Sequence, residues 1–258
     1  MIADSPLYCR IGLTFAAAAA AIAAFLPAGA GAGLAPDPAH FCSAASTLQG
    51  KVLVTRYVPD ALAKIGPDFR TLYAVRKLKF AWKQPGKIRI EGTSPILGSA
   101  LLLVDGPTRT FEVPKLRIHQ TQNLATHPTQ RLSILEYAGL ISADTVKEMH
   151  WAHVGAADLN GHQTEIYDLA WLGVTSRSHY RVWIDDDTHI TDQRAWFDSA
   201  GKLKATFRYE APQQIVPGIW APTRIVILNA DGAVGAETEL SDVSANGVLA
   251  DSLFQAGS

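Results

Sequence analysis

The chain has 258 residues, of which 48% are hydrophobic and 18% are charged. Its 23 basic and 24 acidic residues leave a formal net charge of -1. This balance argues against nucleic acid as a partner, because phosphate binding requires a surplus of Lys and Arg. The length allows one large domain or two small ones.

The beginning of the chain, rich in alanine and glycine, has the pattern of an export signal. Residues 13–26, LTFAAAAAAIAAFL, form an apolar stretch of 14 residues. A membrane-spanning helix needs about 20 residues, whereas the shorter stretch is typical of a signal peptide. Small residues follow Pro27, and we expect cleavage after Ala30 or Ala32. We therefore predict a signal peptide over 1–32 and a single domain over 33–258, the alternatives being an uncleaved anchor or a buried helix.

The number of cysteines indicates whether a disulfide can stabilise the mature protein. Cys9 lies in the predicted leader, so only Cys42 remains and no intramolecular disulfide can form. The hydrophobic core must stabilise the domain, which is feasible because a chain of roughly 225 residues buries about 70% of its unfolded surface. The residues before Cys42, Ala39-His40-Phe41, do not form a lipobox. We expect a soluble protein of the periplasm and not a lipoprotein.

The mature chain opens with an expected amphipathic helix over residues 37–48, with Asp37 before it and Gly50 as a stop. From Lys51 onward, β-branched and aromatic residues recur between closely spaced turn signals, which is typical of strands. These turn signals are Pro85-Gly86, Asp105-Gly106, Asn160-Gly161, Asp185-Asp186-Asp187, 198–201 and Asp231-Gly232.

Several segments between these turns alternate with period two, so that one face is apolar and the other polar. The segments 100–104 and 225–228 are apolar on both faces and are expected to lie under a cover. The alternating apolar sets are Leu78, Phe80 and Trp82; Ile88 and Ile90; and Leu203, Ala205, Phe207 and Tyr209.

Residues 127–149 break this rhythm, since their apolar residues recur at roughly helical spacing. Ser142 is placed to cap a second short helix that ends at Met149. We therefore expect a helical insertion near 127–149 within an α+β domain that is built on a large antiparallel sheet.

Motifs for chemistry are weak. His150 and His153 have the spacing of metal ligands on a helix, but in the expected strand they point to opposite faces. The acidic run 185–187, with His189 and Asp192, lacks the spacing of a calcium loop and fits a hairpin turn better. The sequence contains no G-x-S-x-G elbow and no phosphate-binding loop. We expect no enzyme, catalytic residue, metal or cofactor, although the scattered Ser and His residues leave a spatial triad open.

The six tryptophans all fall in expected strands or at strand ends. Each is interpreted as an ordinary core residue, because an aromatic side chain buries a large area. Together they also fit a sheet that encloses an apolar cavity. They are Trp82, Trp151, Trp171, Trp183, Trp196 and Trp220.

Three stretches of sequence carry a resemblance to a known family. Residues 80–114 form a strand, a Lys-x-Pro turn and three further strands, the second of which ends in Asp-Gly and the last in Pro. Residues 181–209 form three strands separated by an acidic turn and an Asp-to-Gly turn. The motif WAP at 220–222 leads the penultimate strand, and DSLF at 251–254 closes the domain. This layout, over about residues 37–256, resembles the LolA/LolB-like superfamily of periplasmic outer-membrane lipoprotein-sorting proteins.

The resemblance implies a strongly curved antiparallel sheet, a half-open β-barrel, whose concave face is covered by helices. The segments 37–48 and 127–149 would form this cover, with an apolar cavity beneath it. The implied function is that of an exported, monomeric carrier that binds lipid or lipoprotein acyl chains, in outer-membrane lipoprotein sorting or lipid trafficking. An inner-membrane donor and an outer-membrane acceptor are the implied partners. Relatives of the same fold act as envelope sensors or protein-interaction modules, and this alternative stays open.

The alternation predicts which side chains line the cavity, although an error of one residue in a strand would reverse its facing. Residues 56–68, with Pro59, Gly66 and Pro67, are interpreted as a loop that is longer than in the compact carrier and shapes the cavity mouth. The predicted lining is Phe80, Trp82, Ile88, Ile90, Leu101, Leu103, Phe207 and Tyr209.

Overall fold

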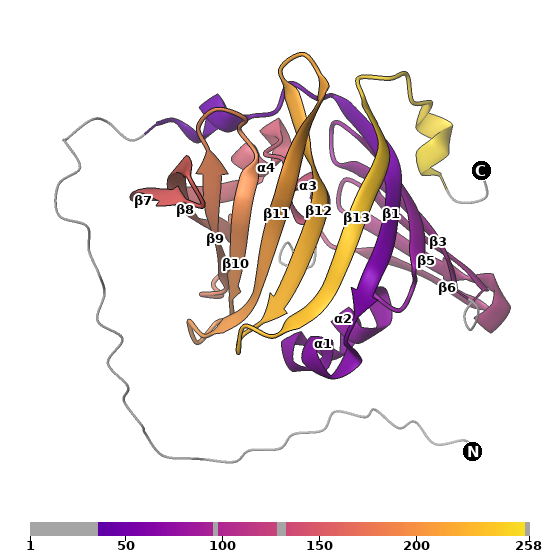
Figure 1. Cartoon of the computed structure of the whole chain (residues 1–258). Coiled ribbons are helices and arrows are strands. Elements are labelled where there is room, and N and C mark those ends of the chain that lie inside the picture. Colours follow the sequence, from indigo (N-terminus) through magenta and orange to yellow (C-terminus); the bar gives the residue numbers. More distant parts are fainter. Residues whose placement is uncertain (1–35, 95–97, 128–132, 256–258) are drawn as a thin grey trace, which may run out of the picture. The chain divides into compact units, whose positions relative to one another are not determined.

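The computed structural model of the chain describes residues 36–94, 98–127 and 133–255 (Figure 1). The predicted signal peptide over 1–32 lies outside these described residues. Within the described part, no helix is long and apolar enough to cross a membrane.

In the described residues, thirteen strands form one antiparallel sheet in the order β6-β5-β4-β3-β2-β1-β13-β12-β11-β10-β9-β8-β7. The edge strands β6 and β7 do not pair with each other, so the sheet is open, and the prediction of a large antiparallel sheet is confirmed. The strands are β1 (Thr47–Tyr57), β2 (Lys77–Lys83), β3 (Lys87–Ser94), β4 (Gly98–Asp105), β5 (Thr108–Val113), β6 (Ile118–Asn123), β7 (Met149–Leu159), β8 (His162–Trp171), β9 (His179–Asp185), β10 (Thr191–Phe197), β11 (Leu203–Val216), β12 (Ile219–Asn229) and β13 (Val234–Ala245).

The predicted turn residues join neighbouring strands. Asn160 and Gly161 connect β7 and β8 with φ values of 58° and 90°, the positive angles of a type I′ hairpin turn. Between β9 and β10, an Asp185 carboxylate oxygen accepts hydrogen bonds from the backbone N–H groups of Asp187 (3.0 Å) and Thr188 (2.6 Å). The acidic run is therefore a hairpin turn, as the sequence predicts.

The strand order explains the helical insertion. Strands β1 to β6 and strands β7 to β13 each follow one another through the sheet, so the chain must pass from one outer edge to the other after β6. The passing segment contains α3 (Ile134–Ala138) and α4 (Ala143–Glu148), which lie within the stretch 127–149 where the sequence predicts a helical insertion. Ser142 caps α4 as predicted, since its side chain accepts a hydrogen bond of 3.2 Å from the Thr145 N–H.

The helix expected over 37–48 is wrong. Only one 3-10 turn forms, η1 (Pro38–Phe41), with Asp37 as its capping residue. Strand β1 already begins at Thr47 because it pairs with both β2 and β13. Leu48 is fully buried in this seam, and tertiary burial overrides the local helix propensity.

The loop expected over 56–68 is also wrong. Strand β1 continues to Tyr57, and two helices follow, α1 (Pro59–Ile65) and α2 (Pro67–Leu72). Pro59 and Pro67 occupy the first helical position of each, where a missing N–H costs nothing and the fixed φ favours the helix. Gly66 separates the two helices. Proline and glycine, which are typical of loops, thus mark the starts and ends of two helices here.

The core consists of two groups of buried apolar side chains. The first joins β1 to β4 with β10 to β13, and it includes Leu62 and Ile65 of α1 and Ile134 and Ala138 of α3. The second lies on β7 to β9 and includes Phe41 of η1 and Leu135 of α3. Consecutive residues of α3 thus join both groups. In Figure 1, α3 and α4 lie behind the strands labelled β10 to β12, and α1 and α2 lie near the lower ends of β13 and β1.

Candidate functional site

Six of the eight predicted lining residues share one face of the sheet, which we call the inner face. Strand register places Phe80 opposite Ile90 and Trp82 opposite Ile88 on β2 and β3. Phe207 and Tyr209 share this face on β11 and belong to the same buried group. All six side chains are between 2% and 7% exposed, so they are packed against other parts of the protein in this structure.

Leu101 and Leu103 lie on the opposite face, which is a correction to the predicted lining. On β4, Leu101 pairs with Glu91 and Leu103 with Arg89, whereas Leu102 pairs with Ile90. Paired residues point to the same side of a sheet, so Leu102 and its alternate Val104 belong to the inner face. Alternation offered no signal in this strand, because both of its faces are apolar.

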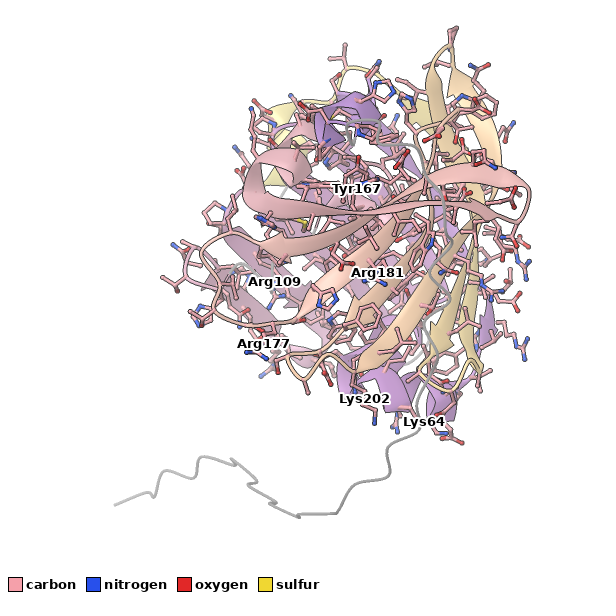
Figure 2. The ribbon with its side chains drawn as sticks, turned by 90° about the vertical axis from the view of Figure 1, so that its left-hand side faces the viewer. Lys64, Arg109, Tyr167, Arg177, Arg181 and Lys202 are labelled. Atoms are coloured by element: carbon pink, nitrogen blue, oxygen red, sulfur yellow. The ribbon has the colours of Figure 1, made fainter. Side chains whose placement is uncertain are left out.

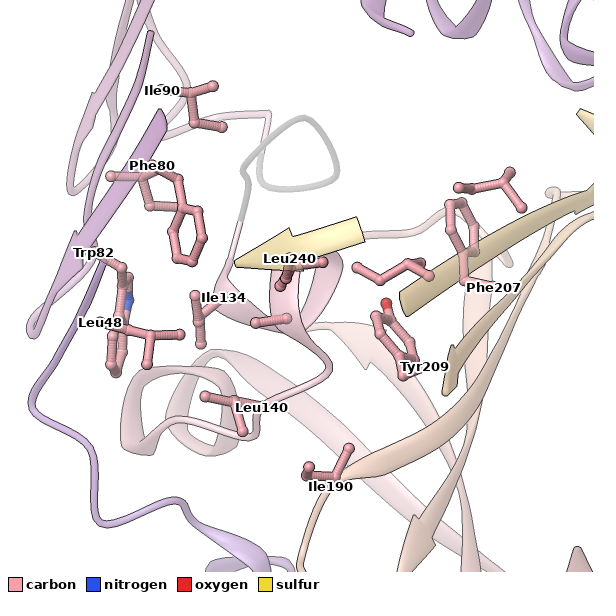
Figure 3. Close-up of a cluster of buried hydrophobic side chains, with 14 of the residues drawn as sticks. Leu48, Phe80, Trp82, Ile90, Ile134, Leu140, Ile190, Phe207, Tyr209 and Leu240 are labelled. Carbon is pink, nitrogen blue, oxygen red and sulfur yellow. The ribbon is translucent and has the colours of Figure 1, made fainter. Parts of the chain in front are cut away.

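Helix α3 occupies the space in front of the inner face. Figure 3 shows Ile134 of α3 and the following Leu140 between Phe80 and Trp82 on one side and Tyr209 on the other. Ile134 and Leu140 are 1% and 2% exposed. The passing segment therefore fills, with aliphatic side chains, the place where the sequence predicts a cavity.

One side chain links α3 to the sheet by hydrogen bonds. The Tyr209 hydroxyl donates to the Leu135 carbonyl oxygen at 2.8 Å and accepts from Nε of Arg194 at 3.2 Å. Gly139 ends α3 with a φ of 65°, and a Cβ on it would lie 2.9 Å from the Tyr209 ring. Only glycine combines this backbone conformation with this close approach.

Arg194 is a buried cation on the inner face, and it is 3% exposed. The carbon of its guanidinium lies 3.9 Å from the centre of the Phe207 ring and 4.8 Å from the centre of the Tyr180 ring. Among the described residues, none holds a carboxylate oxygen in an ion pair with this guanidinium. The internal segments 95–97 and 128–132 contain no Asp or Glu. Within the described part of the chain, two aromatic faces and the Tyr209 hydroxyl therefore take the place of a counterion.

Arg194 is not among the site residues that the sequence predicts. The signal that identifies it is the alternation of β10, which places Arg194 on the same side as Trp196, an inward position for a charged residue. Burial raises the pKa of the neighbouring Tyr209 and Tyr180 hydroxyls, so both stay neutral at physiological pH. Arg194 is thus a buried charged group in contact with neutral aromatic side chains.

Glu136 of α3 is the carboxylate that influences this region. One of its oxygens accepts a hydrogen bond of 2.8 Å from the Ser133 N–H and completes the capping box of α3. The other oxygen is buried and has no hydrogen-bond partner among the described residues. Its charge contributes to the raised pKa values of Tyr180 and Tyr209. Glu136 and Arg194 are therefore electrostatic neighbours that do not form an ion pair.

The second buried group lies around Tyr167 of β8, which is labelled in Figure 2 together with Arg181 of β9. The Tyr167 hydroxyl donates to the Pro36 carbonyl oxygen at 2.5 Å. Arg181 forms a two-pronged ion pair with Asp168, with N to O distances of 2.7 and 2.9 Å. These contacts fix Pro36 and the β8–β9 pair, and none of them involves Arg194.

The opposite face of the sheet, which we call the outer face, carries a groove of about 680 Å³. Leu53, Leu101 and the exposed Lys77 and Lys79 are among its lining residues. The C-terminal 3-10 turn η4 (Asp251–Phe254) packs on β3 and β4. Arg89 holds it there through a hydrogen bond of 2.8 Å to the Leu253 carbonyl oxygen. Of the predicted lining residues, Leu101 therefore contributes to an outer groove.

One group of polar side chains has the composition of a metal site. His162, Asp185 and Asp192 place their ligand atoms within 4.8 Å of one another. Asp185 already accepts hydrogen bonds within its own turn, and Nδ1 of His162 lies 2.9 Å from it and 3.4 Å from Asp192. Burial and the nearby Asp185 charge raise the pKa of Asp192 to about 6. His150 and His153 do not belong to this group.

The chain folds as an open antiparallel sheet with short helices packed on its inner face. This is the fold of LolA superfamily proteins, so the resemblance inferred from the sequence is confirmed for the fold.

Comparison with solved structures supplies the particular likenesses. A LolA superfamily protein from Nitrosomonas europaea is 17% identical with a TM-score of 0.58, over 85% of this chain and 94% of that one. A DUF1329 family protein from Desulfovibrio piger is 13% identical with a TM-score of 0.59, over 86% and 98%. A Vibrio parahaemolyticus domain, provisionally assigned to outer membrane lipoprotein sorting, is 11% identical with a TM-score of 0.58, over 84% and 93%. No family model and no curated protein sequence matches the chain.

Proposed function

We propose that this protein is an exported periplasmic carrier that binds the acyl chains of lipids or lipoproteins between the inner face and its helices. The observation that carries the proposal is the position of Ile134 and Leu140, two aliphatic side chains that lie between the two halves of the sheet. An acyl chain that took their place would find the same apolar surroundings. Burial of each CH₂ group contributes about 0.8 kcal/mol. The role requires no catalysis, and the protein would act as a monomer.

Helices α1 and α3 serve as a cover that opens in this proposal. A helix as short as Ile134–Ala138 has no stability of its own, because isolated helices need about 12 residues or more to persist in water. Its position depends on the side chains that it buries and on the Tyr209 hydrogen bond. An acyl chain can therefore compete with it for the inner face.

The test uses a fluorescent fatty acid and two neighbouring substitutions on β4. Leu102→Asp places a charge on the inner face and should weaken binding at least tenfold, whereas Leu101→Asp, on the outer face, should leave binding unchanged. Both residues are half-buried, so their effects on folding are comparable. Absence of micromolar binding by the wild-type protein, or equal binding by both variants, would contradict the proposal. Lipid extracted from purified protein provides an independent measurement.

The export step is tested separately. We propose that residues 1–32 are a signal peptide, removed after Ala30 or Ala32, and that the domain over 33–258 is the mature carrier. N-terminal sequencing of protein recovered from the periplasm should begin at Gly31 or Gly33. A first residue of Met1 in that fraction would contradict it.

A second function stays open, that of an envelope sensor or protein-interaction module. The observation in its favour is that the edge strands β6 and β7 each pair on one side only among the described strands, since an extended segment of another protein can add to an exposed strand. Val154 on edge strand β7 is 46% exposed. Co-purification of a stoichiometric envelope protein, lost on Val154→Pro and without bound lipid, would favour this alternative over the carrier.

A further inference from the structure

Arg194 poses an energetic problem that the packing alone does not solve. A guanidinium that is 3% exposed has lost nearly all contact with water. Charges in such places are normally paired, because removing an unpaired charge from water is unfavourable. Arg194 has two aromatic rings and the Tyr209 hydroxyl as its described partners. An ordinary apolar side chain at this position of β10 would fill the inner face without that cost.

Replacement of α3 by an acyl chain would make the problem more severe, because the site would stay dry. Glu136, whose charge is felt at Arg194, belongs to α3 and is bound to it through the capping box with Ser133. Arg194 belongs to β10, in the interior of the sheet. When α3 leaves the inner face, Glu136 leaves with it, and Tyr209 loses its Leu135 partner. The cation then remains on the sheet without its nearby negative charge.

We propose that Arg194 binds the acidic group of the ligand, a carboxylate or phosphate carried by the same molecule whose acyl chain replaces α3 on the inner face. The planar guanidinium presents several N–H donors that match the oxygens of such a group. Phe207 and Tyr180, which lie against it, would exclude water from the pair and strengthen it. This inference rests on the proposed carrier function and adds that the ligand is an anionic amphiphile.

The experiment compares two probes with the same chain and different ends, a dansyl-labelled undecanoic acid and its primary amide. Wild-type protein should bind the acid at least tenfold more tightly than the amide. Arg194→Met should weaken binding of the acid to the level of the amide and leave the amide unchanged. Arg208→Met is the matched control: Arg208 lies on neighbouring strand β11 with an exposed side chain on the outer face, and the substitution should preserve the preference for the acid.

The outcomes separate this inference from the carrier function. Equal binding of acid and amide by the wild-type protein, or a preference that survives Arg194→Met, overturns the role of Arg194 and leaves the carrier intact. Failure of both probes to bind overturns both proposals. If circular dichroism shows that Arg194→Met does not fold, Arg194→Lys is used instead, because it keeps the charge without the planar guanidinium. It should lower the preference for the acid without abolishing it; an unchanged or absent preference then counts against the inference.

Acetate should compete with the acid only at concentrations far above those of the probe, and competition at equal concentration would show that the chain is not needed.

Discussion

The hydroxyl of Tyr209 donates a hydrogen bond of 2.8 Å to the carbonyl oxygen of Leu135, and this bond fastens α3 to β11. Tyr209→Phe removes it and leaves a buried carbonyl without that partner, so the free energy of unfolding should fall by about 1–2 kcal/mol. Amide hydrogens in residues 134–139 should also exchange faster with solvent. Tyr57→Phe is the control, since the Tyr57 hydroxyl donates to the Arg70 carbonyl oxygen at 3.0 Å in an exposed position. Equal losses in the two variants would show that the buried bond has no special role.

Gly139 combines a positive φ with contact to the Tyr209 ring, and the two costs can be separated. Gly139→Ala should destabilise the protein by about 2–4 kcal/mol, because a left-handed backbone costs about 1 kcal/mol for a residue with a Cβ and the contact adds the rest. The control is Gly106→Ala, because Gly106 has a similar φ of 54° and a Cβ on it would have nothing within 4 Å. It should show only the backbone cost. Chemical denaturation measures both, and equal losses would mean that α3 shifts freely.

Asp192 should make stability depend on pH in the acidic range. Its pKa is raised to about 6 in the folded protein from an ordinary 3.8, so the folded state favours the protonated form. The stabilisation is complete below about pH 4 and is lost as pH rises through 6. Asp192→Asn imitates the protonated form and should stabilise the protein at pH 8 by about 1 kcal/mol, since solvent near the site reduces the full effect. At pH 4 its effect should be small.

Thermal unfolding at the two pH values checks this prediction. Asp187→Asn is the control, because Asp187 is an exposed carboxylate of the same turn. A stabilisation of equal size at pH 4 and pH 8 would show that the Asn side chain acts by packing and not through the charge.

The C-terminal turn η4 should contribute to stability through one side chain. Phe254 is 3% exposed, and η4 packs on β3 and β4 of the outer face. Phe254→Ala should cost about 3 kcal/mol, because it leaves a cavity where an aromatic ring was buried. Leu253→Ala, at a half-buried neighbour, should cost clearly less. Indistinguishable denaturation midpoints would show that η4 is only loosely attached.

Patterns of neighbouring residues predicted the features that depend on neighbouring residues, namely strand facing and turns. The period-two pattern identified the facing of Phe80 and Phe207 because each of their strands has one polar face. It failed for Leu101 and Leu103, where residues on both faces are apolar and only the pairing with β3 decides. Turn residues such as Asn160 and Gly161 imposed their own backbone angles and were identified correctly.

Features that depend on distant parts of the chain were missed. The start of β1 at Thr47 is set by pairing with β13, about 200 residues away, and not by the helix-forming residues before it. Pro59 and Gly66 indicate a loop locally, yet α1 forms because Leu62 is buried against the inner face. Arg194 has no local motif. Its importance becomes visible only when α3 and Phe207 close around it.

The pairing of the first strand with the last has a consequence for how the molecule assembles. Each half of the sheet consists of hairpins between neighbours in the chain, which can form early and independently. The seam between the halves is different, because Leu48 must meet Ala245. A chain that emerges N-terminus first, from a ribosome or across a membrane, therefore cannot close its inner face until β13 is free to pair with β1. Until then both halves expose apolar surface, and a product truncated before β13 lacks the strand with which β1 pairs.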